Sequence, residues 1–159
     1  MTTKQSWTMN IDGASRGNPG PAGAGIYLVK NNTEVEKHHV YLGTKTNNQA
    51  EYFALALGLF FARKAMEKDR TSTRDLAVIS DSELLVRQMR GEYKIKNEGL
   101  RQFSMLITTL MHGIHCTFRH VLRDQNKQAD KLANEGIDGR GNVPDEFITL
   151  LAHHGIKLT

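Results

Sequence analysis

The chain has 159 residues, of which 39% are hydrophobic and 24% are charged, and this composition is typical of one folded globular domain. No apolar run approaches the roughly 20 residues that span a bilayer, and the single cysteine excludes both an internal disulfide and a cysteine-built zinc site. The formal net charge of +4 is compatible with a polyanionic partner such as a nucleic acid.

The N-terminal residues 1–6 lack the apolar core that a secretory leader carries. We therefore expect a cytoplasmic protein that does not associate with a membrane. We also expect a monomer with no obligate protein partner.

Three strand-like segments come first in the chain. They are rich in apolar and β-branched residues, and they cover residues 8–11, 23–29 and 34–42. The short connection between the second and third segments predicts a hairpin, so the three strands are expected to form an antiparallel meander. Residues 46–48 offer N-cap side chains, and residues 49–66 predict a long and largely buried helix.

The rest of the chain predicts alternating strands and helices. Residues 76–79 form a continuous apolar run, which is typical of a central parallel strand, and a short helix follows it. The later elements expected are a helix at 100–111, a strand at 116–122, a helix at 126–137 that Asn126 caps, and a short helix at 147–152. This order predicts an α/β fold with a mixed five-stranded sheet, an antiparallel meander plus two parallel strands, and helices on both faces. We expect one domain over residues 1–159, with a core at 7–137 and a C-terminal tail at 138–159.

Four acidic residues stand where predicted elements begin or end. Asp12 follows the first strand and opens a glycine-rich turn, and Asp81 follows the fourth strand. If these two strands are parallel neighbours, both carboxylates flank the crevice that opens where the strand order reverses. Glu51 enters the long helix, and Asp130 begins the last helix of the core at the same edge. The four side chains are therefore expected to cluster.

Each acid also has a local structural explanation. Asp12 precedes a glycine, as in many turns, and Glu51 lies in a first helical turn, where an acid complements the helix dipole. Asp81 lies inside a capping-box pattern that begins at Ser80, and Asp130 could pair with a neighbour on its own helix. The shared sheet edge favours one cluster over four separate roles.

The donor chemistry of this set is uniform. All four side chains are carboxylates, and no histidine or cysteine accompanies them with the spacing of a metal site. Hard oxygen donors suit Mg²⁺, with Mn²⁺ able to substitute, better than they suit zinc.

Four motifs around these acids carry a resemblance to a known family. They are Asp-Gly-Ala-Ser-Arg-Gly-Asn-Pro-Gly-Pro-Ala-Gly at 12–23, Thr-Asn-Asn-Gln-Ala-Glu at 46–51, Ser-Asp-Ser at 80–82 and Asn-x-x-x-Asp-x-Leu-Ala at 126–133. With these motifs in this order, the chain resembles a type-1 ribonuclease H over residues 7–137. The resemblance implies a ribonuclease H-like fold and endonucleolytic cleavage of the RNA strand of an RNA/DNA hybrid, leaving 5′-phosphate and 3′-hydroxyl ends.

The resemblance also implies roles for individual residues. The metal-binding and catalytic set would be Asp12, Glu51, Asp81 and Asp130, which would hold two divalent ions when substrate is bound. The family distinguishes RNA from DNA through 2′-hydroxyl groups. The polar candidates for that contact are Asn18, Asn48 and Gln49, while Thr46 and Asn97 would hold a phosphate of the DNA strand, and Gly13 and Asn47 complete the substrate-binding set. Helix capping is the alternative role for Asn47 and Asn48.

The chain departs from the family pattern in its basic residues. The loop at 90–100 is too short for the basic helical protrusion that some members use to grip substrate, and Lys94 and Lys96 are expected to substitute for it in part. Where the phosphate pocket often carries an arginine, this chain has Thr44, with Lys45 alongside.

A third departure concerns the mobile histidine that family members often carry before the last acid. Counting back from Asp130 gives His120, which is expected to lie in the fifth strand as a buried and partnered residue. We therefore assign the functional role to Arg123, at the end of that strand, with a solvated surface arginine as the alternative.

Two other functions use the same features. The first is a related metal-dependent nuclease or polynucleotidyl transferase that acts on DNA, because a shared fold does not fix the substrate. The second is a nucleic-acid-binding module without catalysis. The Thr-Asn-Asn-Gln segment at 46–49 favours hybrid recognition over the first, and the presence of all four acids argues against the second.

Overall fold

The structure of the protein is a computed structural model that describes residues 6–70 and 74–158. Residues 1–5, on which the expectation about a leader segment rests, lie outside the described residues. Among the described residues, no helix combines the length and apolarity needed to cross a membrane.

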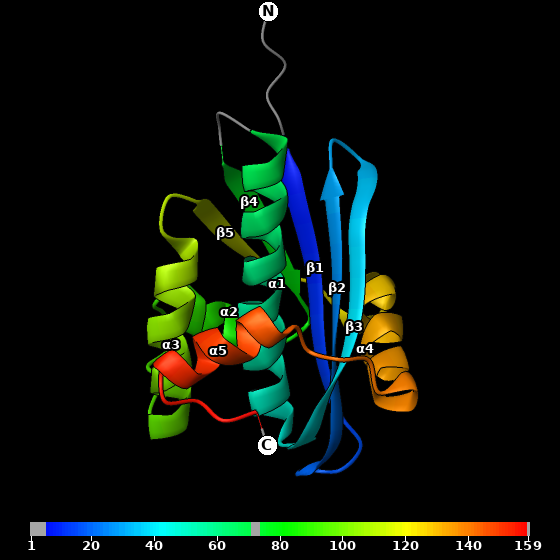
Figure 1. Cartoon of the computed structure of the whole chain (residues 1–159), viewed down its shortest axis with the longest axis vertical. Coiled ribbons are helices and arrows are strands. Elements are labelled where there is room, and N and C mark those ends of the chain that lie inside the picture. The colour runs from blue at the N-terminus through cyan, green and yellow to red at the C-terminus, as the bar shows by residue number, and fades with distance from the viewer. Residues whose placement is uncertain (1–5, 71–73, 159) are drawn as a thin grey trace, which may run out of the picture.

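One mixed sheet forms the centre of the molecule (Figure 1). Its strands are β1 (Trp7–Ser15), β2 (Gly20–Lys30), β3 (Thr33–Lys45), β4 (Asp75–Ser80) and β5 (His115–His120). They lie in the order β3-β2-β1-β4-β5. The first three pair antiparallel, whereas β4 pairs parallel with both β1 and β5. The predicted meander and the predicted parallel contact between the first and fourth strands are therefore confirmed.

Helices cover both faces of this sheet, as the sequence predicts (Figure 1). They are α1 (Asn47–Asp69), α2 (Glu83–Met89), α3 (Glu98–Met111), α4 (Lys127–Gly139) and α5 (Asp145–His153), with a 3₁₀ turn at Arg123–Gln125. On one face α1 packs against the sheet and is itself covered by α3, and α4 packs on the other face. Gly25 of β2 allows α4 to pack closely on the sheet, since a Cβ on Gly25 would lie 2.3 Å from the carbonyl oxygen of Ala129 in α4.

The expected C-terminal tail belongs to the same core. Helix α5 lies across α1 (Figure 1), and Phe147 meets Phe60 of α1 with ring centroids 5.4 Å apart. Leu151 is fully buried, and Phe147 is 1% exposed. Burying two such side chains contributes roughly 1.5–3 kcal/mol each, so this segment is tied to the domain rather than appended to it.

The glycine-rich turn predicted after Asp12 is mostly strand. β1 continues to Ser15, and Asp12 pairs with Gly25 of β2. The glycines in this part of the sheet permit this, because the backbones of α1 and α4 lie directly against its two faces. The parallel pairing of β1 with β4 stops earlier, at Asn10 and Ile79. Asp12 therefore lies inside β1 but past the last residue of β1 that pairs with β4, where the expected crevice opens.

Two further local predictions are wrong. The capping box expected from Ser80 to Glu83 does not form: Ser82 is the N-cap residue of α2, and its hydroxyl accepts the N–H of Leu85. The hydroxyl of Ser80 instead accepts the N–H of Ser82 in the turn. His120 lies in β5 as expected but is exposed, because β5 forms the outer edge of the sheet.

Candidate active site

Three of the four predicted acids converge at the edge where β1 and β4 part. Asp12 comes from β1, Glu51 from the first half of α1 and Asp81 from the residue after β4. One carboxylate oxygen of each lies within 4.8 Å of the others. Asp12 is 4% exposed and Glu51 is 8% exposed, so two of the three charges are withdrawn from water. The clustering predicted from the edge rule for parallel strands is found.

Gly13 explains how Glu51 reaches this cluster. A Cβ on Gly13 would lie 2.2 Å from the carbonyl of Ala50, so only glycine allows β1 and the start of α1 to approach this closely. The backbone N–H of Gly13 donates to the Glu51 carboxylate and lowers its pKa slightly against larger opposing effects. Gly13 is buried, so the structure gives it a positioning role within the site, and direct contact with substrate stays a prediction.

The electrostatics of the cluster are those of a site whose negative charge protons or a cation must neutralise. Burial, followed by repulsion from Glu51, Asp81 and Asp130, raises the pKa of Asp12 to about 10. Burial and the charge of Asp81 likewise raise the pKa of Glu51. One buried oxygen of Glu51, Oε2, has no hydrogen-bond partner among the described residues. A buried carboxylate oxygen without a donor costs free energy, and a divalent cation would supply the missing partner.

Asp130, in the first turn of α4, completes the group from the opposite face of the sheet. It lies outside the tight triad, but its carboxylate is close enough to Asp12 to raise the pKa of that residue through charge and a hydrogen bond. Its side chain is 31% exposed, and the Arg123 guanidinium Nη2 lies 3.6 Å from its Oδ1. All four predicted acids therefore meet at one edge of the sheet.

Asn126 is a positioning residue whose role the sequence did not reveal. We expected its side chain to cap α4, but it makes no capping hydrogen bond. Its amide instead donates to the carbonyl oxygen of Ile11 at 2.9 Å and accepts from the Asn10 amide at 3.0 Å. The side chain is 1% exposed and joins β1 beside Asp12 to the start of the helix that carries Asp130. In the sequence, only the spacing of Asn126 from Asp130 in the Asn-x-x-x-Asp motif indicated that it belongs to the site.

The predicted substrate-binding residues surround the first turn of α1. Thr46 and Gln49 form a capping box, in which Thr46 Oγ1 accepts from the Gln49 N–H and Gln49 Oε1 accepts from the Thr46 N–H. Asn18, in the connection between β1 and β2, accepts the N–H of Asn47 at 3.0 Å. Capping is thus carried by these three side chains. Those of Asn47 and Asn48 are exposed, with no hydrogen bond among the described residues.

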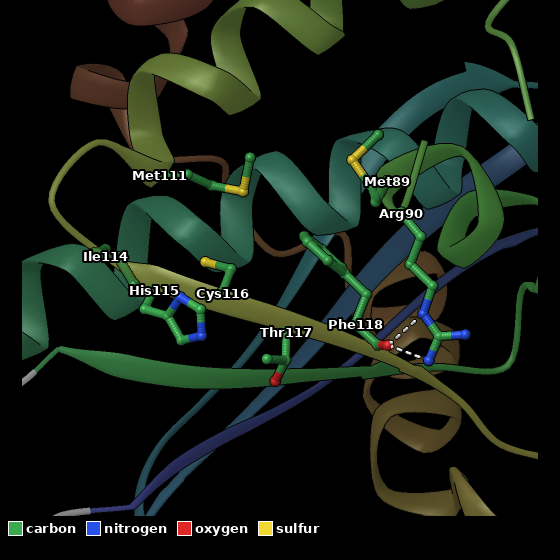
Figure 2. Close-up of a pocket in the computed structure, with 8 residues that line it drawn as sticks. All are labelled: Met89, Arg90, Met111, Ile114, His115, Cys116, Thr117 and Phe118. Carbon is green, nitrogen blue, oxygen red and sulfur yellow. Dashed lines mark hydrogen bonds between the residues drawn. The ribbon is translucent and has the colours of Figure 1, made fainter. Parts of the chain in front are cut away.

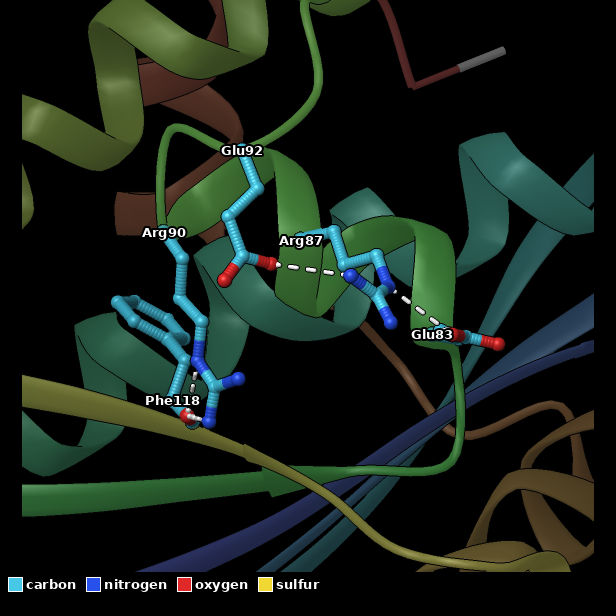
Figure 3. Close-up of polar contacts among 5 residues, drawn as sticks. All are labelled: Glu83, Arg87, Arg90, Glu92 and Phe118. Carbon is cyan, nitrogen blue, oxygen red and sulfur yellow. Dashed lines mark hydrogen bonds and ion pairs between the residues drawn. The ribbon is translucent and has the colours of Figure 1, made fainter.

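The loop between α2 and α3 contains no helix, as the sequence predicts. Figure 3 shows Arg87 bridging Glu83 at 2.9 Å and Glu92 at 3.4 Å, which holds the beginning of the loop against α2. The guanidinium also lies 5.4 Å from the ring centroid of Tyr93. At the other end Asn97 caps α3, because its Oδ1 accepts the N–H of Leu100, and its amide remains exposed.

A separate cavity of about 630 Å³ lies along the free edge of β5 (Figure 2). Its lining includes Met89, Met111 and Phe118, and none of the four acids contributes to it. Arg90 donates two hydrogen bonds, at 2.9 and 2.6 Å, to the Phe118 carbonyl and so blocks part of this strand edge. Burial raises the pKa of Cys116 to about 11, so its thiol offers no nucleophile at neutral pH.

The sequence is similar to known proteins over most of its length. It matches the family described as reverse transcriptase-like over residues 10–136. Bifunctional protein Rv2228c of Mycobacterium tuberculosis is 36% identical over 133 residues, which are 82% of this chain and 35% of that protein. Ribonuclease HI of Halobacterium salinarum is 37% identical over 130 residues, 80% of this chain and 62% of that protein. The chain thus spans about a third of the mycobacterial relative.

A solved structure decides the family. LC11-RNase H1 in complex with RNA/DNA hybrid matches with a TM-score of 0.78 at 36% identity, and the match covers 84% of this chain and 98% of that one. The chain belongs to the type-1 ribonuclease H family. The resemblance carried by the four motifs is therefore confirmed, together with the fold it implies. In this chain the metal and substrate roles of single residues stay predictions.

The raised pKa values predict a pH-dependent stability for the metal-free protein. Folded Asp12 and Glu51 have pKa values above the unfolded values of about 4, so the folded state binds more protons than the unfolded state. Their contribution is full below about pH 4 and is lost as pH rises through the folded pKa values. We expect the Tm of metal-free protein to fall from about pH 5 to about pH 9, and Asp12→Asn to flatten this slope. A wild-type Tm that rises over this range would contradict the electrostatic description.

Asn126→Ala tests the link between β1 and α4. Loss of the amide leaves the Ile11 carbonyl without its buried donor. We therefore expect the free energy of unfolding, measured in denaturant, to fall by about 1–3 kcal/mol. Mn²⁺ affinity, measured by calorimetry where the variant is still folded, should also fall because Asp12 and Asp130 lose their common anchor. Gln128→Ala is the control, since Gln128 is exposed on the same helix and makes no side-chain hydrogen bond among the described residues. Unchanged Mn²⁺ affinity in Asn126→Ala would leave Asn126 with a structural role only.

Proposed function

We propose that this chain is an endoribonuclease that hydrolyses the RNA strand of RNA/DNA hybrids and leaves 5′-phosphate and 3′-hydroxyl ends. The observation that carries this proposal is the buried oxygen-only cluster, in which a Glu51 oxygen has no donor among the described residues. The relative named ribonuclease HI and the LC11 complex with RNA/DNA hybrid support the choice of substrate. The domain would act as a monomer.

The donor set fits divalent cations. Asp12, Glu51, Asp81 and Asp130 would hold two Mg²⁺ ions with substrate bound, and Mn²⁺ would substitute. The chemistry that such ions would supply when bound is activation of the attacking water and stabilisation of the leaving oxygen. The carboxylates balance the charge of the ions and fix their positions. The rigid contacts at Gly13 and Asn126 hold the carboxylates in place before substrate arrives.

Substrate recognition would come from the exposed polar groups around the start of α1. Asn18 and Gln49 use their carbonyl oxygens to cap the helix, which leaves their amide N–H groups available to a bound strand. Together with the exposed amide of Asn48, they would contact base edges and 2′-hydroxyls in the minor groove. Thr46 and Asn97 would hold a phosphate of the DNA strand, and Asn47 would line the same surface. Gly13 would act from beneath it, by setting how closely β1 approaches the start of α1.

Arg123 would act on the charged product beside the metal site. Its side chain is 80% exposed and reaches toward Asp130. A guanidinium does not deprotonate at working pH, so it cannot transfer protons, but it attracts phosphate as a delocalised cation. Arg123 would therefore draw product or a metal ion away after cleavage.

A cleavage assay tests the proposed function. We expect the purified protein to cut the RNA strand of a labelled hybrid with Mg²⁺ or Mn²⁺, and to leave DNA duplex and RNA duplex intact. Asp12→Asn and Asp81→Asn should abolish cleavage while retaining the fold, because each removes one charge from a repelling cluster. Full activity in excess chelator, or preferred cutting of DNA duplex, would refute the proposal. A variant that keeps more than about a tenth of the wild-type rate, a loss below ~1.4 kcal/mol, would not have lost a core metal ligand.

Arg123→Ala tests the product-release role. We expect it to lower the multiple-turnover rate more than single-turnover cleavage, because binding and chemistry do not depend on it. Arg119→Ala is the charge-matched control on β5. His120 is the competing candidate, and since it is exposed, His120→Ala should leave the Tm unchanged. If His120→Ala lowers turnover and Arg123→Ala does not, the two roles are reversed.

A further inference from the structure

Strand β5 leaves one edge of the sheet open, because among the described residues it pairs with β4 alone. The N–H of His115 donates to the Arg74 carbonyl, so every second residue from His115 turns its backbone polar groups toward β4. The backbone groups of Cys116 and Phe118 therefore point away from the sheet, and the bonds from Arg90 to the Phe118 carbonyl agree with this direction. An edge of this kind is a template for one more strand.

The open edge borders the cavity of about 630 Å³ that is bounded by β5 and by the ends of α2 and α3 (Figure 2). Met89, Met111, Cys116 and Phe118 line this groove, and each is only partly buried against the core. Methionine side chains are flexible, so they adapt to apolar partners of different shape. Apolar surface beside a free strand edge is the combination that binds an extended peptide as an added strand.

Arg90 adds a positive charge to the groove without an acid paired to it. Its Nε and Nη2 atoms donate to the Phe118 carbonyl, and no hydrogen bond of Nη1 is found among the described residues. Figure 2 shows this third nitrogen pointing away from Phe118. The acids on and after α2, Glu83 and Glu92, pair with Arg87 instead (Figure 3). A carboxylate at Nη1 would complete a charge-assisted hydrogen bond.

The charges of β5 favour an acidic partner over a second copy of this chain. The strand carries His115, Arg119 and His120 but no acid, and no acid lines the groove among the described residues. Two β5 strands side by side would place these basic residues opposite one another, and like charges across a strand pair are destabilising. A strand that carries carboxylates would place opposite charges together.

We propose that this groove binds an extended acidic segment of another protein as a sixth strand of the sheet, beside β5. The segment would exchange backbone hydrogen bonds with Cys116 and with the N–H of Phe118. It would place an apolar side chain between Met89 and Met111, and a carboxylate beside Arg90. None of the four acids of the candidate active site lines the groove, so the bound segment would not occupy that site. This interaction does not depend on the proposed function, and it would bring the domain to a partner protein.

A peptide titration of the isotope-labelled protein tests this interaction, with the backbone amide signals in NMR spectra as the readout. The probe is the synthetic peptide acetyl-Asp-Val-Asp-Phe-Asp-Val-Asp-amide, which alternates carboxylates with apolar side chains. We expect the amide signals of Cys116 and Phe118 to shift, with a Kd of about 0.1–1 mM. The same peptide with Lys in place of every Asp should bind at least about tenfold more weakly. This comparison uses wild-type protein and so does not depend on the folding of any variant.

Arg90→Glu is the decisive variant. It should weaken binding of the Asp peptide about threefold to tenfold and strengthen binding of the Lys peptide, because the charge at the groove is reversed. Arg70→Glu is the matched control, since Arg70 is exposed at the end of α1 and does not line the groove. Arg90 is exposed, so we expect its variant to fold, and Arg90→Gln supplies a milder change if the Tm falls.

Equal binding of the two peptides to wild-type protein, or wild-type affinity for the Asp peptide in Arg90→Glu, would overturn the proposal. Shifts confined to residues outside β5, α2 and α3 would overturn it too, as would the absence of any shift at about 2 mM peptide. If the β5 amide signals change when the protein alone is diluted, the edge is occupied by a second copy of this chain and the acidic partner is refuted.

Discussion

Mutual repulsion among four carboxylates is the main physical constraint on this fold. Asp12, Glu51 and Asp81 bring ligand oxygens within 4.8 Å of one another, and two of these side chains are nearly inaccessible to water. Like charges this close oppose folding unless a cation lies between them or protons neutralise some of them. The scaffold must therefore hold the cluster together when the cation is absent. Each acid comes from a different element, so the fold as a whole supplies the rigidity that no single element could.

The contacts that supply this rigidity involve small residues and buried amides. Gly13 lets α1 lie against β1 without an intervening Cβ, and Gly25 does the same for α4 on the other face. Asn126 then joins the two layers through the backbone of β1. Such contacts leave little freedom for the carboxylates to move apart. A site arranged before its ligands bind does not need to reorganise when they arrive, and this preorganisation is what electrostatic catalysis requires.

The sequence predicted the parts of this site that follow from strand direction and residue chemistry. Asp12 and Asp81 were placed together because parallel strands end at one edge. The sequence did not predict the long-range contacts of Asn126. Its side chain bonds to two residues that lie 115 and 116 positions earlier in the chain, whereas its local sequence pattern was typical of a helix cap. The burial of His120 was predicted wrongly because β5 alternates like an inner strand but lies at the sheet edge. The local sequence pattern shows which side chains share one face of a helix or strand. The neighbouring elements determine whether that face is covered.

The acidic centre and its basic surroundings have separable roles. A phosphate approaching four carboxylates is repelled unless cations lie between, so the centre alone cannot hold a nucleic acid. Under the proposed function, affinity would then come from donors set further out, around the start of α1, where the caps engage the carbonyl oxygens of Asn18 and Gln49 and leave their amide N–H groups free. Because these donors are neutral amides or cations and the centre is anionic, the proposed function implies that binding would depend on salt and catalysis on metal. This proposed division would account for a basic chain that keeps acids at its strand ends: the excess of positive charge would bring the substrate to a site that its acids would otherwise repel.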